Sequence, residues 1–240
     1  MNILVTGGAS GLGEAITRKL ASDTGNNVFF SFCHSAKNAG QLEKECSNTT
    51  AIPCNFQNPL DIESLLSFIE NTQLDTLVNN AFATSISQEY FHKTEIELFA
   101  RNFQSNIMPV IQITQKAIIN FRKQKFGRII NILSSAIINT PPKGWAEYVA
   151  SKAYLSSLSK TWATENSRFN ITSNSISPSF LQTSLNAGID PRTVEGIIEN
   201  NPLKKLLTTK EVAEAVHFLA NSSQQINGIN LIMNAASDVI

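Results

Sequence analysis

Tyr148 and Lys152 are two residues of this chain whose types and spacing could carry out chemistry together. They lie four positions apart in AEYVASKAYL, residues 146–155, a stretch with the pattern of a helix. Residues i and i+4 of a helix lie one above the other on the same face. An ammonium close to a phenol favours the phenolate and lowers a phenol pKa that is ordinarily about 10. Such a phenol could exchange a proton near neutral pH, but the same spacing also occurs in exposed helices, so other residues must decide.

A glycine-rich turn near the N-terminus is the second candidate site. The predicted strand NILVT runs straight into TGGASGLG, residues 6–13, and then into a helix. A strand, a tight glycine turn and a helix N-terminus together make a phosphate-binding site. Gly7 lets the chain reverse, Gly11 lets backbone approach a pyrophosphate, and Gly13 lets the helix pack closely on the sheet. The turn therefore predicts a dinucleotide site, with a merely tight turn as the alternative.

Short apolar runs alternate with helical patterns along the whole chain, and several runs are almost continuously apolar, as in parallel strands covered on both faces. Strands are predicted over 2–6, 28–33, 50–54, 74–79, 128–133, 171–177 and 228–233, and helices over 12–22, 37–46, 59–71, 94–124, 146–167 and 209–221. This order predicts an α/β fold of Rossmann type, a doubly wound parallel seven-stranded sheet within a three-layer α/β/α sandwich. We expect residues 1–240 to form a single domain, with a small helical substrate lid near 183–205.

The glycine spacing TGxxxGxG, together with Tyr148-xxx-Lys152, resembles the short-chain dehydrogenase/reductase family in its compact single-domain form. LVNNAF (77–82) resembles the family's NNAG element, and GRIINILSS (127–135) resembles the strand that carries the catalytic serine. ISPSFLQT (176–183) resembles the element that covers the nicotinamide. The C-terminal stretch PLKKLLTTKEVAEAVHFLANSSQQINGINLIMNAA is similar to that of 3-oxoacyl-carrier-protein reductases.

This resemblance implies hydride transfer between a nicotinamide and a carbonyl or alcohol carbon, with proton transfer at the oxygen. It implies that Tyr148 is the general acid/base and that Lys152 lowers the phenol pKa and hydrogen-bonds the nicotinamide ribose. A serine would hold the substrate oxygen as charge develops on it. Asn106 would position a water that relays protons to the lysine.

Two adjacent serines compete for the catalytic position. Counting from Gly127 along the strand without a gap selects Ser134, whereas counting back from Tyr148 by the family's usual spacing selects Ser135. A slip of one residue in a strand reverses the face of every side chain, but the following loop AIINTPPKGWAE can absorb an insertion. The sequence therefore favours Ser134.

The end of the second predicted strand bears on the choice between NAD and NADP. An acidic residue there would accept a hydrogen bond from the adenine ribose 2′-hydroxyl and indicate NAD. The segment SFCHSAKN has no carboxylate, and Ser31, His34, Ser35 and Lys37 could surround a 2′-phosphate. NADP is therefore favoured over NAD, although Ser10 stands where many NADP-dependent relatives carry arginine. An ordinary solvated loop is the alternative for His34 and Lys37.

The residues expected to bind the cofactor follow the predicted strands or belong to the Tyr-Lys pair. Asn55 stands where the family usually has an aspartate, and its amide oxygen can still accept a hydrogen bond. The expected set is Gly7, Ala9, Ser10, Gly11, Leu12, Gly13, His34, Ser35, Asn55, Phe56, Asn80, Ala81, Tyr148, Lys152, Pro178, Phe180, Leu181 and Thr183.

Three departures from the family pattern concern shape and not the reacting groups. Phe82 replaces the glycine of NNAG, and its side chain must either turn away from the cofactor or narrow the site. Ser179 replaces a glycine after Pro178, and Asn234-Ala235-Ala236 replaces an acidic-glycine-glycine end. Phe91, Trp145 and Phe180 are expected near the substrate, with ordinary packing as the alternative for each.

Composition limits the other function classes. The 240 residues carry 19 basic and 19 acidic side chains, which gives no electrostatic basis for binding nucleic acid or an anionic membrane. No run of 18 apolar residues occurs, and the opening NILVTGG lacks the pattern of a secretory signal. Cys33, Cys46 and Cys54 share no metal-ligand spacing with the histidines, so we expect no metal site and a cytoplasmic protein.

We expect the partners to be a small-molecule or carrier-bound carbonyl substrate and further copies of the chain. Relatives assemble through their two long helices, here 94–124 and 146–167, into dimers or tetramers, and a tetramer is favoured. An idle nucleotide-binding sensor on the same fold is the competing function. A sugar epimerase fits less well because its glycine spacing differs, and an enoyl reductase because it separates tyrosine and lysine more widely.

Overall fold

The computed structural model describes every residue except 139, 184–188, 238 and 240. Its seven strands form one sheet in the order β3-β2-β1-β4-β5-β6-β7, and every neighbouring pair is parallel. The strands are β1 (Asn2–Val5), β2 (Asn27–Phe32), β3 (Thr49–Pro53), β4 (Thr76–Asn79), β5 (Gly127–Ile132), β6 (Ile171–Pro178) and β7 (Asn230–Met233). The predicted strands and the doubly wound α/β fold are confirmed, with strand ends shifted by no more than two residues.

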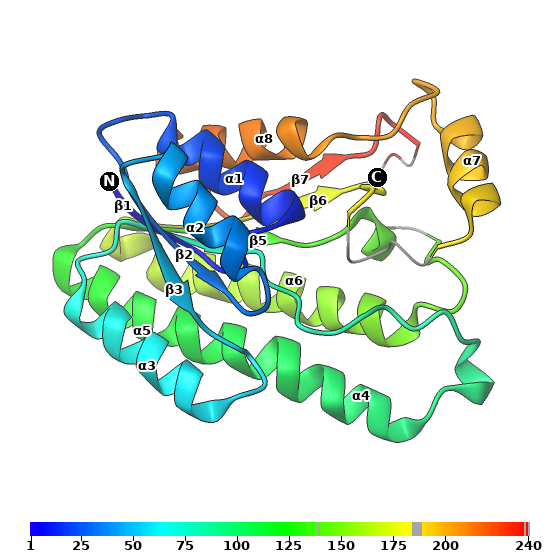
Figure 1. Cartoon of the computed structure of the whole chain (residues 1–240), viewed down its shortest axis with the longest axis horizontal. Coiled ribbons are helices and arrows are strands. Elements are labelled where there is room, and N and C mark those ends of the chain that lie inside the picture. The colour runs from blue at the N-terminus through cyan, green and yellow to red at the C-terminus, as the bar shows by residue number, and fades with distance from the viewer. Residues whose placement is uncertain (139, 184–188, 238, 240) are drawn as a thin grey trace.

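Helices cover both faces of the sheet (Figure 1). Helices α1, α2 and α8 lie on one face, and α3, α4, α5 and α6 lie on the other. Their bounds are α1 (Gly11–Ala21), α2 (Ala36–Glu45), α3 (Pro59–Asn71), α4 (Ile96–Asn102), α5 (Met108–Gln124), α6 (Ala146–Asn166), α7 (Pro191–Asn200) and α8 (Thr209–Asn221). The three-layer arrangement is therefore the predicted one.

Each face of the sheet has its own apolar core because successive strand residues point to opposite faces. In β1, Ile3 and Val5 pack toward α1 and α8, whereas Leu4 packs toward α3 and α5. In β5, Ile129 and Ile130 divide in the same way. Both faces of the sheet are covered by buried apolar side chains, which explains why the strands are almost continuously apolar in sequence.

The predicted helix 94–124 is interrupted in the structure. A π-helical turn, Phe103–Ile107, joins α4 to α5. Pro109 is the second residue after this turn and has no backbone N–H to donate to the preceding turn, so regular α-helical bonding cannot continue through it. Single π-turns inside helices are frequent at functional sites, and this one contains Asn106.

Helix α7 lies within the predicted excursion 183–205 and stands apart from the three layers (Figure 1). Residues 184–188 of that excursion lie outside the described residues. Within the described part of the chain, no helix is long and apolar enough to cross a membrane.

Candidate active site

The glycine turn connects β1 to α1 and adopts the backbone conformation that its glycines permit. Gly7 has φ +65° and Gly11 has φ +53°, both in the left-handed region that side chains disfavour. A Cβ on Gly13 would lie 1.9 Å from the carbonyl oxygen of Gly7. Gly13 is thus required because α1 starts directly against the turn, and not only because the helix packs on the sheet.

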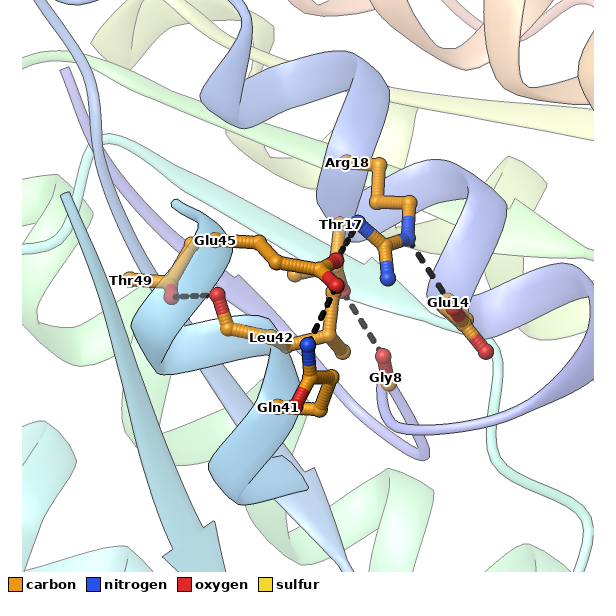
Figure 2. Close-up of polar contacts among 8 residues, drawn as sticks. All are labelled: Gly8, Glu14, Thr17, Arg18, Gln41, Leu42, Glu45 and Thr49. Carbon is orange, nitrogen blue, oxygen red and sulfur yellow. Dashed lines mark hydrogen bonds and ion pairs between the residues drawn. The ribbon is translucent and has the colours of Figure 1, made fainter. Parts of the chain in front are cut away.

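Neighbouring elements hold the turn in place. The Asn80 side chain, at the end of β4, donates from Nδ2 to the carbonyl oxygens of Thr6 and Gly7 at 2.9 and 3.2 Å. Buried Thr17 of α1 donates from Oγ1 to the Gly8 carbonyl at 3.0 Å (Figure 2). One residue further along α1, Arg18 pairs with Glu14 and with Glu45 of α2 at 2.9 and 2.6 Å. These contacts hold the backbone of the glycine turn in one conformation.

A cavity of about 1150 Å³ runs from this turn along the carboxyl ends of the strands to Tyr148 and Lys152. Every residue expected from the sequence to bind the cofactor lines it, and so does Ser134. Sequence reasoning missed several other lining residues, among them Cys33, Cys54, Gln88, Lys143 and Thr193. Four of these five lie on loops that leave the strands, and no periodic pattern predicts where such loops turn.

Tyr148 and Lys152 lie on α6 and face the cavity together, as their spacing predicts. Tyr148 is 8% exposed and Lys152 is 5% exposed, so the pair is not a surface feature. The Lys152 ammonium donates from Nζ to the Ile132 carbonyl oxygen at 2.8 Å, which ties α6 to the end of β5. Its Nζ lies 5.8 Å from the centroid of the Tyr148 ring.

Burial dominates the protonation of both groups. Burial raises the pKa of the Tyr148 phenol, and a hydrogen bond with the Ser134 side chain lowers it in part. Burial also lowers the pKa of the Lys152 ammonium, to about 8. Burial therefore sets the direction of the phenol pKa shift here, and the lowering expected from Lys152 together with an oxidised nicotinamide stays a prediction.

The two serines occupy different environments. Ser134 is 9% exposed, accepts a hydrogen bond from the Ala136 N–H at 3.2 Å, and is the serine whose side chain lowers the pKa of the Tyr148 phenol. Ser135 is half-buried and also lines the cavity. This geometry supports Ser134 as the serine beside the reacting oxygen.

Among the four predicted catalytic residues, Asn106 alone does not line the cavity. It is 2% exposed, and its Oδ1 accepts from the Ala83 N–H at 2.6 Å. Its Nδ2 donates to Thr84 Oγ1 at 2.9 Å and to Asn102 Oδ1 at 3.3 Å. The Asn106 side chain therefore supports the loop after β4, so its predicted role in holding a water for Lys152 stays a prediction.

Phe82 does not turn away from the site. Its ring lies edge-on to Tyr148 with centroids 5.2 Å apart, and the Lys152 Nζ is 5.3 Å from its centroid. The Trp145 ring lies edge-on to the Tyr148 ring with centroids 5.7 Å apart, and Trp145 lines the cavity, as expected. Phe91, by contrast, is 72% exposed and does not line the cavity, so its expected place there is wrong.

Glu147 is a further residue of the site that the sequence did not single out. It is 2% exposed, and its Oε1 accepts from the Ser87 N–H at 2.9 Å, which fixes the loop beside the cavity. Its Oε2 has no partner among the described residues. An acidic residue in the first turn of a helix is expected for the helix dipole alone, so sequence offered no reason to select it.

The end of the cavity away from Tyr148 is lined by the residues that precede two helices. Ser10 precedes α1 and Ser35 precedes α2, both hydroxyls line the cavity, and neither caps its own helix. His34 lines the same region, whereas Lys37 does not. Helix N-termini with available hydroxyls suit the phosphates of a dinucleotide. The chain thus fits a dinucleotide from the glycine turn to the phenol, and no group of described residues could hold a metal ion.

The fold and site define a Rossmann-type enzyme with a phenol and an ammonium at the end of a dinucleotide cavity. A family model described as enoyl-(acyl carrier protein) reductase matches residues 7–235. The chain is 33% identical over 234 residues to the 3-oxoacyl-[acyl-carrier-protein] reductase FabG of Rickettsia prowazekii, covering 96% of this chain and 94% of that protein. It is 30% identical over 227 residues to MabA of Mycobacterium tuberculosis H37Rv, with 92% and 85% coverage.

A solved structure of a short chain dehydrogenase/reductase family protein superposes with a TM-score of 0.84 at 26% identity, covering 98% of this chain and 96% of that one. The chain belongs to the short-chain dehydrogenase/reductase family. It is an oxidoreductase that uses a nicotinamide dinucleotide.

Proposed function

We propose that this enzyme is an NADPH-dependent ketoreductase that acts on a small or carrier-bound carbonyl of the 3-oxoacyl class. The observation that carries the proposal is the buried Tyr148 phenol, which lines one end of a cavity together with Ser134 and buried Lys152, while the glycine turn lines the other end. The two named relatives are 3-oxoacyl reductases, and the similarity covers 94% and 85% of their lengths. This similarity supports the substrate class.

A nicotinamide held in this cavity would supply the hydride for the carbonyl carbon. The protein supplies the proton: Tyr148 gives its phenolic proton to the carbonyl oxygen as that oxygen gains charge. Ser134 donates a hydrogen bond to the same oxygen and so stabilises the charge that develops on it. The raised pKa of Tyr148 keeps the phenol protonated at neutral pH, which suits the reductive direction.

The NADP preference is supported by the chemistry at the end of β2. Ser10, His34 and Ser35 line the cavity without a carboxylate between them, so nothing there repels a 2′-phosphate. The helix N-termini behind Ser10 and Ser35 favour negative charge. Replacing His34 with aspartate should weaken NADPH binding about tenfold and leave NADH binding within about twofold, because the new carboxylate repels only the 2′-phosphate.

We also propose that the enzyme is a dimer or tetramer in the cytoplasm, and that α7 acts as a substrate lid. The ring pair Phe103–Tyr154, with centroids 5.3 Å apart, lies exposed on the two helical segments expected to form the interface. The mass of the particle in solution, measured by light scattering at micromolar concentration, tests the assembly. A monomer would contradict it.

The decisive experiment compares the wild-type enzyme with Tyr148→Phe on 3-oxoacyl thioesters and simple ketones. Turnover, followed by loss of the reduced nicotinamide absorbance, should fall by more than about 1,000-fold in Tyr148→Phe because the proton donor is gone. NADPH affinity should stay within about threefold, since the ring remains. Retention of full activity would overturn the assigned role.

Two other functions are separated by the same assays. Trans-2-enoyl thioesters test the enoyl reductase activity that the family model's description names. If enoyl thioesters react and ketones do not, the ketoreductase proposal fails. If nucleotide binds and no carbonyl, alcohol or enoyl compound reacts, the enzyme role of the pair fails and the sensor function gains.

A further inference from the structure

Phe82 occupies a position where the family pattern has glycine, and its ring does not join either apolar core. The side chain is half-buried and lines the cavity together with Tyr148 and Lys152. In the described part of the chain, the ring contacts both members of the reacting pair. It therefore acts on that pair and not on the stability of the sheet.

The backbone on both sides of Phe82 is fixed. Before it, the Ala81 N–H donates to Thr6 Oγ1 at 3.0 Å. After it, the Ala83 N–H donates to Asn106 Oδ1 at 2.6 Å. Thr6 and Asn106 are both fully or almost fully buried, at 0% and 2% exposure. The ring can therefore move only by rotation of its own side chain.

The ring meets both members of the pair with favourable geometry. Its plane is 76° from that of Tyr148 with centroids 5.2 Å apart, which is the edge-to-face arrangement that aromatic rings prefer. The Lys152 Nζ lies 5.3 Å from its centroid, within the range of a cation–π interaction. Phe82 is thus in contact distance of the ammonium and the phenol at once.

The Lys152 ammonium makes few other favourable contacts among the described residues. An ammonium has three donors, and among the described residues Nζ makes one hydrogen bond, to the Ile132 carbonyl oxygen. No carboxylate pairs with Lys152 in the described part of the chain. Among the described residues, the rings of Phe82 and Tyr148 lie within 5.3 and 5.8 Å of this buried charge.

We propose that Phe82 is a positioning residue for the reaction, whose π face holds the Lys152 ammonium beside the Tyr148 phenol. This proposal rests on the function proposed above, in which that pair supplies the proton. An aliphatic side chain of similar size fills the same space but offers the ammonium no π face. The chemistry of the ring, and not its bulk, should therefore decide turnover.

The test compares Phe82→Leu with Phe82→Tyr. Phe82→Leu should lower kcat for ketone reduction about tenfold, while the KM for NADPH stays within about threefold. Phe82→Tyr keeps the π face and should stay within about twofold of the wild-type kcat. Phe218→Leu makes the same chemical change at a ring that is 54% exposed on α8 and away from the cavity, and it should leave kcat unchanged.

A structural measurement keeps the proposal separate from the proposed function. Crystal structures of Phe82→Leu and Phe82→Tyr should show the Nζ–Ile132 hydrogen bond lost in the first and kept in the second. If the wild-type protein reduced no ketone, the proposed function would fail, and these crystals would still decide whether Phe82 holds Lys152.

Two results would overturn the role of Phe82. One is an unchanged kcat in Phe82→Leu with an unmoved Lys152. The other is tighter NADPH binding by Phe82→Leu with an unchanged kcat, because the ring would then obstruct the nucleotide instead of positioning the ammonium.

Discussion

The two ends of the cavity are built in different ways. At the nucleotide end, hydrogen bonds fix the backbone of the glycine turn. The Gly7 and Gly8 N–H groups donate to Ser31 Oγ and to the Ser31 carbonyl oxygen at 3.0 and 2.8 Å, and the Asn80 side chain donates to the Thr6 carbonyl oxygen. At the substrate end, side chains from loops and α6 meet one another, as in the contacts of Tyr148 with Phe82 and Trp145. The first end depends on close backbone approach, and the second depends on side-chain identity.

At the nucleotide end, the largest expected effect comes from adding one methyl group. Gly13→Ala places a Cβ 1.9 Å from the Gly7 carbonyl oxygen, so the turn must shift. We expect dinucleotide affinity, measured by fluorescence titration, to fall by more than about 100-fold. Gly196→Ala on α7 is the matched control, since its Cβ meets nothing within 4 Å, and it should leave affinity unchanged. If Gly13→Ala and Gly196→Ala changed dinucleotide affinity equally, the nucleotide end would not depend on close backbone approach.

Lys152 gives a test at the substrate end that uses pH. Its pKa falls from 10.5 to about 8 on burial, so between these values the unfolded chain binds more protons than the folded one. Stability of the wild type should therefore rise with pH across that window. Relative to Lys152→Met, which cannot titrate, the wild type should gain about 2 to 3 kcal/mol between about pH 7 and about pH 10. Urea unfolding of both proteins measures the difference, and a constant difference would show that Lys152 is not desolvated.

The adjacent serines should differ sharply if side-chain identity governs this end. Ser134→Ala removes the hydroxyl that lowers the pKa of Tyr148 and should lower kcat about 100-fold. Ser135→Ala should lower it less than about threefold, because Ser135 is only a neighbour in the cavity wall. Steady-state ketone reduction by the two variants decides between them. The reverse order would place Ser135 beside the reacting oxygen.

The smallest effect is expected at the C-terminal end of the sheet. Ala235 and Ala236 have φ +54° and +60°, in the left-handed region where an L side chain is strained. Each change to glycine should raise the free energy of unfolding by about 0.5 to 1 kcal/mol, measured by urea unfolding. Ala21→Gly, inside the last turn of α1, is the control and should lower it.

Much of the fold and the site was predictable from local patterns. The continuous apolar strands required a sheet covered on both faces, and the glycine turn required a strand before it and a helix after it. The residues expected from the resemblance to bind the cofactor line one cavity, because in a parallel sheet the loops after successive strands meet at one edge. Asn106 was placed at the right helix, but its side chain supports a loop instead of facing the cavity.

Sequence by itself determined the order of the strands and helices, the glycine turn, and the pairing of Tyr148 with Lys152, because each follows from short-range periodicity and backbone sterics. Tertiary structure decided which serine meets the phenol, where the Phe82 ring points, that Glu147 holds Ser87, and the direction of both pKa shifts. Those outcomes depend on burial and on contacts between segments far apart in the chain, and both exist only after the layers have packed.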